Sequence, residues 1–193
     1  MKIVGCGCGP GMLTEAAVET LRSATLVYGS GRSIELCKKY IPDNCEVHEI
    51  SDYKSLKELP DYAVLLSTGD PMLAGLGYLD GEIISGISSM QYSFAKLRVP
   101  LTRSVVVNAH GKDHKIAVSN TVDEILRGKV VFLIADPNFD TKYLCGQILP
   151  ENKTCTISVC ENLGYENERI VTGSVSSPPD VKSDLFVIVA GDY

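Results

Sequence analysis

Apolar positions along the chain follow two different spacings, and these separate predicted strands from predicted helices. Short aliphatic runs, such as residues 62–67, have the length and β-branched content of strands buried on both faces. Segments such as residues 89–97 instead repeat apolar residues every three or four positions, which is typical of one face of a helix. In the first half of the chain the two kinds of segment alternate. This order predicts a parallel sheet covered by helices.

The predicted elements of the first half lie between short turn segments. Strands are expected at residues 2–4, 24–28, 45–50, 62–67 and 82–85, and helices after Thr14, at 33–41, at 52–59 and at 89–97. Thr14 is expected to cap the first helix, and Ser88 or Ser89 the last one, because hydroxyl side chains accept hydrogen bonds from the first free N–H groups.

A second α/β unit is predicted to begin near residue 104. Its expected elements are a strand at 105–107, a helix at 120–127, a strand at 129–135, a helix capped by Asp140, and strands at 154–161, 169–175 and 185–190. The three final strands have no helix between them, so this sheet should be mixed or antiparallel. We therefore predict an N-terminal α/β domain over residues 1–103 and a C-terminal α/β domain over residues 104–193.

Composition narrows the class of protein. Of the 193 residues, 45% are hydrophobic and 22% charged, which is typical of a folded globular chain. No run approaches the roughly 20 apolar residues of a membrane helix, and the net charge of −6 disfavours nucleic-acid binding. The 7 cysteines are scattered and odd in number, as expected in a reducing compartment. We expect a cytoplasmic protein that binds neither membrane nor nucleic acid.

The stretch from residue 65 to 89 is the first candidate site. Gly69 permits dihedral angles that other residues avoid, and Pro71 fixes the backbone, so Asp70 should be held in a rigid exposed turn. Ser88 and Ser89 follow the next strand. Because the carboxyl ends of parallel strands form ligand sites, these residues are expected to border one.

A glycine-rich loop at residues 5–11 follows the first strand and precedes a helix. It departs from the dinucleotide fingerprint, because Pro10 or Met12 stands where the third glycine belongs. Cys6 and Cys8 are separated by a single residue, whereas the cysteines of a metal site are usually separated by two. Few histidines are available to complete a metal site. We expect no bound metal at these cysteines.

Cationic residues concentrate near residue 100 of this acidic chain. They are Lys96, Arg98, Arg103, Lys112 and Lys115, accompanied by His110 and His114. The cluster predicts either a site for an anionic ligand or a solvated surface, and the sequence favours neither. His110 belongs to a turn that directly follows a predicted strand, where functional residues often occur.

Taken together, several segments resemble the tetrapyrrole methylase family over the whole chain. The segments are VGCGCGPG, LLSTGDPML, SGISSMQYSFAKL, NAHGK, VVFLIAD and ENLGYENERIVTG. The resemblance implies two α/β domains that meet at a cleft, S-adenosylmethionine as methyl donor, a reduced tetrapyrrole as substrate, and a homodimer. Within the family the resemblance is greatest to the branch that methylates carbon 5 of cobalt-precorrin-7, where a separate carbon-15 methyltransferase/decarboxylase is an expected partner.

The resemblance also implies site residues. Cofactor contacts are expected from Cys8, Gly69, Asp70, Leu73, Ser88, Ser89, Ile134 and Leu163. Arg103, His110 and Lys112 are expected to hold the carboxylates of the substrate, because cations bind such groups. His110 is also the candidate general base. The alternatives are a related methylase acting on uroporphyrinogen, diphthamide or ribosomal RNA, or a nucleotide-binding module without enzymatic activity.

Overall fold

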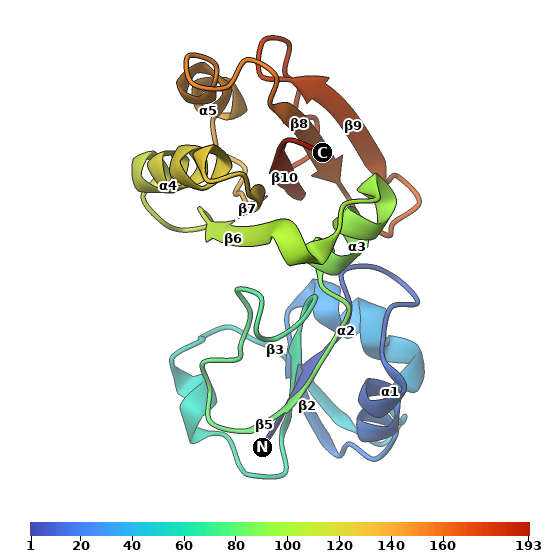
Figure 1. The fold of residues 1–193 in the computed structure, drawn as a ribbon. Helices are drawn as coiled ribbons and strands as arrows, with labels where there is room; N and C mark the ends of the chain where they lie inside the picture. The colour runs from blue at the N-terminus through green and yellow to red at the C-terminus, as the bar shows by residue number, and fades with distance from the viewer. The chain divides into compact units, whose positions relative to one another are not determined.

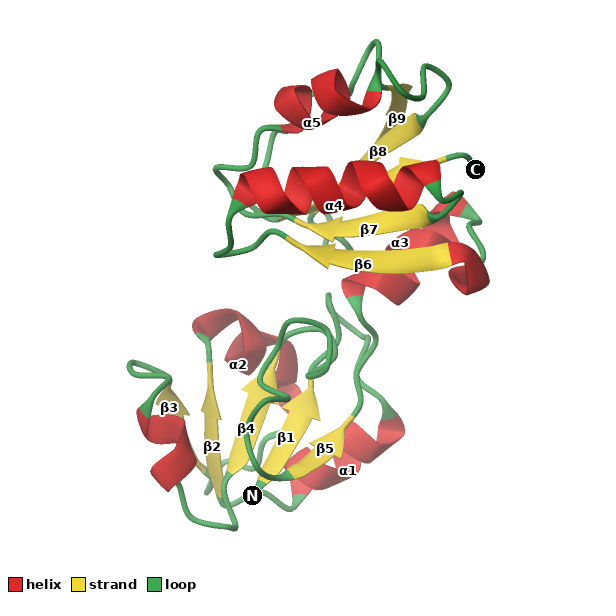
Figure 2. Ribbon diagram, turned by 60° about the vertical axis from the view of Figure 1, so that its left-hand side comes forward, coloured by secondary structure: helices red, strands yellow, loops and turns green.

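Five parallel strands form the sheet of the N-terminal unit in the computed structural model, which describes residues 1–193. They are β1 (Lys2–Gly5), β2 (Leu26–Gly29), β3 (Glu46–Glu49), β4 (Val64–Ser67) and β5 (Glu82–Ile84), in the spatial order β3-β2-β4-β1-β5 (Figure 2). Every paired strand is parallel to its neighbour. The predicted parallel sheet and all five of its strands are confirmed.

The two faces of this sheet are covered differently. Helices α1 (Glu15–Arg22) and α2 (Gly31–Cys37) pack on one face, where the core includes Val4, Leu21 and Leu66. On the other face Ile3 and Leu65 pack against Leu56, Leu76 and Leu79. These last three belong to the short 3-10 helix η2 (Ser55–Glu58) and to the long β4–β5 connection. Because no α-helix fills this connection, the loop after β4 itself forms part of the core.

The C-terminal unit contains a mixed sheet, as predicted. Its strands are β6 (Ser104–Asn108), β7 (Val130–Ile134), β8 (Thr156–Glu161), β9 (Arg169–Ser174) and β10 (Phe186–Gly191), in the order β6-β7-β10-β8-β9. The β6–β7 pair is parallel, whereas β10 pairs antiparallel with both β7 and β8, and β8 pairs antiparallel with β9.

Helices cover both faces of this second sheet (Figure 1). Helices α4 (His114–Leu126) and α5 (Thr141–Ile148) pack on the face that carries Val131 and Leu133. On the opposite face Phe94 of α3 (Ser89–Leu97) makes an edge contact with Phe132, with ring centroids 6.2 Å apart. Alternation along β7 therefore determines which side chains meet which helix.

Three predicted helix caps are confirmed. The side chain of Thr14 accepts a hydrogen bond from Ala17 N, that of Ser88 from Gln91 N, and that of Asp140 from Tyr143 N. Each cap satisfies an N–H group that has no partner within the helix.

Two predicted helices have different bounds. Helix α4 begins at His114, six residues before the predicted residue 120, because Asp113 accepts hydrogen bonds from Lys115 N and Ile116 N and so acts as its cap. Helix α2 begins at Gly31, directly after its N-cap Ser30, and ends at Cys37, whereas the predicted helix covers residues 33–41. The 3-10 helix η1 (Lys38–Tyr40) follows it. The predicted helix at 52–59 is the 3-10 helix η2.

The chain divides between Tyr92 and Ser93, within α3, into the units Met1–Tyr92 and Ser93–Tyr193. The predicted boundary at residues 103 and 104 instead follows the 3-10 helix η3 (Leu101–Arg103), where β6 begins. It stays a prediction. No helix in the structure has the length and apolar character required to cross a membrane.

Candidate functional site

Three loops interlock at the carboxyl edge of the N-terminal sheet. The glycine loop after β1 and the turn after β4 exchange two backbone hydrogen bonds, from Gly7 N to the carbonyl oxygen of Gly69 at 3.1 Å and from Gly69 N to that of Gly7 at 2.9 Å. The loop after β5 joins them, because Cys8 N donates to the carbonyl oxygen of Ile87 at 3.0 Å. The structure thus brings together the glycine loop, the Gly69 turn and the segment before Ser88.

Glycine is required here for two different reasons. A Cβ on Gly5 would lie 2.4 Å from Gly86 N, and a Cβ on Gly86 would lie 2.2 Å from the carbonyl oxygen of Gly69. These glycines are needed for the close approach of one loop to another. Gly69 has φ of 69°, and a Cβ there would find only Ser88 Cα within 4 Å, at 3.9 Å. Gly69 is therefore required by its backbone conformation.

Asp70 holds two of these loops together. Its Oδ2 accepts a hydrogen bond from Gly86 N at 3.0 Å, and its Oδ1 accepts one from Met72 N at 2.8 Å. The carboxylate therefore fixes both its own turn and the loop after β5. Any contact of Asp70 with a ligand would be made by a side chain already oriented by backbone groups.

The other predicted cofactor residues of this unit border the same loops. Ser88 is buried, and its hydroxyl donates to Gln91 Oε1 at 2.9 Å, whereas Ser89 is half-buried at the start of α3. Leu73 is half-buried, with its N–H bonded to the carbonyl oxygen of Asp70. The Sγ of Cys8 lies 3.4 Å from Met12 Sδ. Cys6, by contrast, is fully buried and faces Val4 and Cys37.

This edge fits S-adenosylmethionine. The ligand combines a flat adenine ring and a ribose with a cationic sulfonium, and the edge combines half-buried apolar side chains and glycine-containing loops with one oriented carboxylate, Asp70. No Lys or Arg occurs among the residues of the glycine loop or the turns at 68–73 and 86–89. None of these three segments therefore places a Lys or Arg charge against the sulfonium. For metals, no group of three or more His, Cys, Asp or Glu side chains is positioned to hold an ion, and the metal-free state of Cys6 and Cys8 stays a prediction.

A second set of predicted residues gathers at one edge of the C-terminal sheet. Val187 of β10 pairs with both Ile134 of β7 and Cys160 of β8, and Asn108 of β6 pairs with Ile134. The carboxyl ends of β6, β7 and β8 therefore share one edge. Ile134 is half-buried there, and Leu163 is buried in the turn after β8.

The turn after β6 carries the segment His110–Gly111–Lys112, which we call the HGK turn. His110 N donates to Asn108 Oδ1 at 3.0 Å, Lys112 N donates to the carbonyl oxygen of Ala109 at 3.1 Å, and Gly111 has φ of 62°. The side chains of His110 and Lys112 are exposed and make no hydrogen bond or ion pair in the structure. They are thus available to a ligand.

Arg103 is separated from this turn. It directly precedes β6, whereas the HGK turn follows it, and a strand of five residues spans about 16 Å. Its guanidinium donates to the carbonyl oxygen of Gly128 at 3.2 Å, at the turn before β7. The structure therefore does not bring Arg103, His110 and Lys112 together, although the three are close in sequence.

Asp136 is a residue of this edge that the sequence analysis did not single out. Its Oδ2 lies 3.0 Å from His114 Nε2 and accepts a hydrogen bond from Gly111 N at 3.3 Å, and its Oδ1 accepts one from Asn138 N at 3.0 Å. The hydrogen bond from His114 is the main cause that lowers the pKa of Asp136 below its usual value. The signal available in the sequence was an acid directly after the strand VVFLIA.

Glu161 is a second missed residue, at the end of β8. It is buried and accepts hydrogen bonds from Arg169 Nη1 at 2.5 Å, from Ser183 N at 2.9 Å and from Lys182 N. Burial alone would raise the pKa of Glu161, but the Lys182 N–H and the Arg169 guanidinium lower it below its usual value. This carboxylate anchors the loop before β10 and is not free for a ligand.

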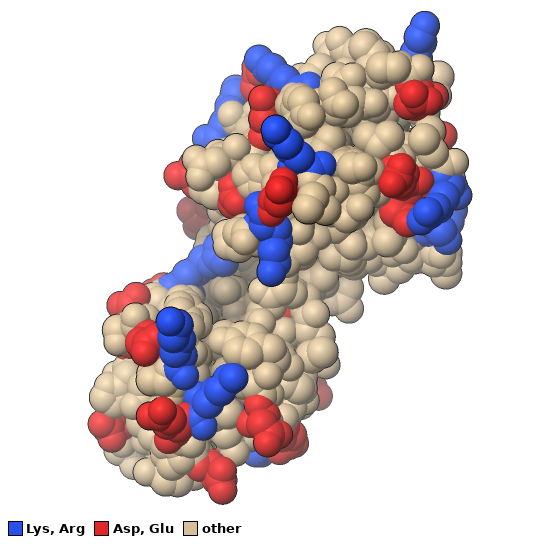
Figure 3. All heavy atoms as spheres, turned by 90° about the vertical axis from the view of Figure 1, so that its left-hand side faces the viewer, with Lys and Arg blue, Asp and Glu red and all other residues tan.

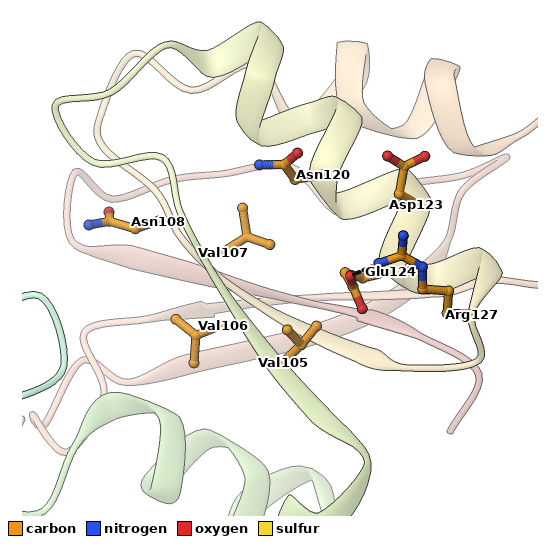
Figure 4. Close-up of a pocket in the computed structure, with 8 residues that line it drawn as sticks. All are labelled: Val105, Val106, Val107, Asn108, Asn120, Asp123, Glu124 and Arg127. Atoms are coloured by element: carbon orange, nitrogen blue, oxygen red, sulfur yellow. Dashed lines mark hydrogen bonds and ion pairs between the residues drawn. The ribbon is translucent and has the colours of Figure 1, made fainter.

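A hollow of about 350 Å³ lies away from these predicted residues, between β6 and α4 (Figure 4). It is lined by Val105, Val106, Val107, Asn108, Asn120, Asp123, Glu124 and Arg127.

On the face of the molecule in Figure 3, Lys and Arg side chains are interspersed with Asp and Glu over both units. That face has no continuous basic surface of the kind that binds nucleic acid.

The sequence of this chain is similar to those of known proteins. Residues 2–179 match the family of tetrapyrrole (corrin/porphyrin) methylases. A probable cobalt-precorrin-7 C(5)-methyltransferase of Methanocaldococcus jannaschii is 34% identical, with 85% of each chain covered. A cobalt-precorrin-7 C(5)-methyltransferase of Salmonella typhimurium is 23% identical, with 88% of each chain covered.

Solved structures show the same fold. The precorrin-6Y methylase of Archaeoglobus fulgidus is similar with a TM-score of 0.77 and 28% identity, covering 100% of this chain and 98% of that one. A uroporphyrin-III C-methyltransferase of Thermus thermophilus, solved with S-adenosyl homocysteine, has a TM-score of 0.72 and 17% identity, covering 99% and 96%. The matched family spans nearly the whole chain, so this protein belongs to the tetrapyrrole (corrin/porphyrin) methylases.

Proposed function

We propose that this protein transfers a methyl group from S-adenosylmethionine to carbon 5 of cobalt-precorrin-7. The observation that carries this proposal is the 34% identity to the relative from M. jannaschii named for that reaction, over 85% of each chain. The match extends over both α/β units and is not confined to one motif. A general nucleotide-binding module would not require the second unit to be retained.

The chemistry requires positioning more than a reactive side chain. When bound, S-adenosylmethionine supplies a methyl group activated by its sulfonium. The electron-rich carbon of the macrocycle is the nucleophile, so the protein has to orient both molecules and exclude water. A residue that removes a proton can assist, and His110 is the proposed base because histidine exchanges protons near neutral pH.

The cofactor is proposed to bind along the interlocked loops of the N-terminal unit. Cys8, Gly69, Asp70, Leu73, Ser88 and Ser89 are the proposed contacts, with Ile134 and Leu163 proposed from the C-terminal unit. Support comes from the hydrogen bonds that hold Asp70 at the loops carrying Gly69 and Gly86. The carboxylate is oriented before any ligand arrives, which lowers the cost of ordering it on binding.

Substrate carboxylates are proposed to bind His110 and Lys112 in the HGK turn. Both side chains are exposed and have no partner in the protein, so no existing interaction must be broken. Arg103 is proposed as a substrate contact on its charge alone, and its hydrogen bond to Gly128 counts against that role. Arg103→Ala and Lys112→Ala therefore have to be tested separately.

The test is to incubate the purified protein with labelled S-adenosylmethionine and a panel of tetrapyrroles. The panel contains cobalt-precorrin-7, metal-free precorrin-7 and uroporphyrinogen III. We expect one methyl mass on cobalt-precorrin-7 and no transfer to uroporphyrinogen. Methylation of uroporphyrinogen alone, or cofactor binding without transfer to any tetrapyrrole, would overturn the proposal.

A homodimer, a separate carbon-15 methyltransferase/decarboxylase partner and a cytoplasmic location are proposed with this function. The 7 cysteines are odd in number and scattered along the chain, which supports a reducing compartment. Light scattering of the purified protein measures the oligomeric state. Copurification from cells that make the corrin ring tests the carbon-15 partner.

A further inference from the structure

We propose that Asp136 and His114 form a positioning pair that holds the HGK turn in the shape that binds substrate. This inference rests on the proposed function for its consequence in catalysis, and on the structure alone for the pair itself. Neither residue is proposed to touch the substrate.

The geometry links three segments through one carboxylate. Asp136 follows β7, His114 is the first residue of α4, and Gly111 is the centre of the HGK turn. Oδ2 of Asp136 lies 3.0 Å from His114 Nε2 and 3.3 Å from Gly111 N. An ionised carboxylate only accepts hydrogen bonds, so Nε2 of His114 carries the proton and Nδ1 is left without it while the imidazole is neutral.

The surroundings fix His114 from a second side. Its ring makes an edge contact with Phe139, with centroids 5.3 Å apart, and its side chain is 32% exposed. Asp136 is held in turn by Asn138 N. Both supports come from the turn after β7, so the segment that carries Asp136 also orients His114, as expected of residues that orient others.

The turn needs such support because of its own conformation. Gly111 has φ of 62°, the three residues of the turn are exposed, and a Cβ at Gly111 would meet nothing within 4 Å. No other part of the protein fills the space beside the α-carbon of Gly111 where a side chain would stand. The hydrogen bond to Asp136 is the tertiary contact of the Gly111 amide, while the side chains on either side of it remain free to bind.

The experiment compares Asp136→Asn and His114→Asn with Asp123→Asn. Asp123→Asn removes the same charge from an exposed position of α4, so it controls for net charge. Amide hydrogen exchange at Gly111 is measured first, because it does not depend on activity. We expect at least tenfold faster exchange in Asp136→Asn and unchanged exchange in the control.

Kinetics form the second readout. We expect the KM for the tetrapyrrole to rise roughly three- to thirtyfold in Asp136→Asn and His114→Asn, with kcat and the Kd of S-adenosylmethionine within twofold of wild type. In the double variant the KM should rise no more than in the more strongly affected single variant, because the pair acts as a unit. His114→Gln keeps an N–H donor on a side chain that is longer than that of Asn. Its KM should therefore lie between that of His114→Asn and that of the wild type.

The outcomes separate this inference from the proposed function. If the wild type methylates no tetrapyrrole, the proposed function fails, and Gly111 exchange still tests the pair. If exchange is unchanged in Asp136→Asn, the pair does not hold the turn. If kcat falls while KM stays unchanged in folded variants, the residues act in the chemical step and the positioning role is wrong.

Discussion

Gly86 is a residue where an added side chain has almost no room. A Cβ there would lie 2.2 Å from the carbonyl oxygen of Gly69, which is backbone and cannot rotate away. We therefore expect Gly86→Ala to reduce the free energy of unfolding by about 1–3 kcal/mol, as overpacking does. Denaturant unfolding measures this change.

Gly146→Ala is the matched control for that substitution. Gly146 lies within α5, and a Cβ there would meet nothing within 4 Å. Alanine favours the helix, so this change should stabilise the protein by about 0.5–1 kcal/mol. Equal effects of the two substitutions would show that the close approach of Gly86 to Gly69 is unimportant.

At the scale of elements, Asp113 determines where α4 begins. Its Oδ1 accepts hydrogen bonds from Lys115 N at 2.8 Å and Ile116 N at 3.3 Å. Asp113→Ala should lower the free energy of unfolding by about 0.5–2 kcal/mol, whereas Asp113→Ser should retain most of it. Chemical denaturation of both variants distinguishes a lost cap from a lost charge, since serine keeps only the cap.

The bounds of α4 also show what the sequence could and could not predict. Apolar spacing found the second half of this helix, and Gly128, with φ of 76°, marked its end. The first half was missed because His114 and Lys115 were interpreted as members of the cationic cluster near residue 100, and Asp113 was not recognised as a helix cap. Strands were predicted well because buried runs of aliphatic residues identify them without reference to distant segments.

The candidate site was predicted in part for a related reason. Loops that follow parallel strands open at one edge of the sheet, so the Gly69 turn and Ser88 could be expected at one site. The association of Gly69 with the glycine loop depends on the pairing of β1 with β4, which the structure shows. Arg103 was grouped with His110 because the two are near in sequence, but β6 lies between them. Asp136 was missed because it lies far from Gly111 and His114 in the sequence. The two residues come within hydrogen-bond distance of Asp136 only when β6 and β7 pair.

At the scale of the whole molecule, Glu161 and Asp136 make stability depend on pH. The pKa of each is lowered in the folded protein, by Lys182 N–H and Arg169 against the effect of burial for Glu161, and by His114 for Asp136. A lowered pKa contributes stability above the ordinary carboxyl value, and that contribution is lost as pH falls through the folded value. Stability should therefore fall below about pH 4.5.

Glu161→Gln tests the contribution of Glu161 to this effect. The variant should lose about 1–3 kcal/mol of stability at pH 7, because Gln leaves the N–H groups around it with a weaker acceptor. Its unfolding free energy should also change less between pH 6 and pH 3 than that of the wild type, over about the range where carboxyl groups titrate. Parallel pH profiles for the two proteins would contradict the assignment.

The thiols divide into two classes across the molecule. Five are buried, namely Cys6, Cys37, Cys145, Cys155 and Cys160, and two, Cys8 and Cys45, are partly exposed. Burial raises the pKa of Cys145 to about 11 and that of Cys155 and Cys160 to about 12, so these thiols are protonated and unreactive at neutral pH. A thiol reagent should modify the two exposed cysteines in the folded protein and the other five only on unfolding.

This difference gives a direct test of the proposed cofactor position. Cys8 lies in the glycine loop, where its backbone N–H donates to the carbonyl oxygen of Ile87. Cys45 precedes β3 in another part of the N-terminal unit. Saturating S-adenosylmethionine should slow modification of Cys8 at least tenfold and leave Cys45 unchanged. Because both thiols react without global unfolding, general stabilisation by a ligand would not produce this selectivity. Equal rates at Cys8 with and without the cofactor, measured by mass spectrometry of the labelled peptides, would remove Cys8 from the site.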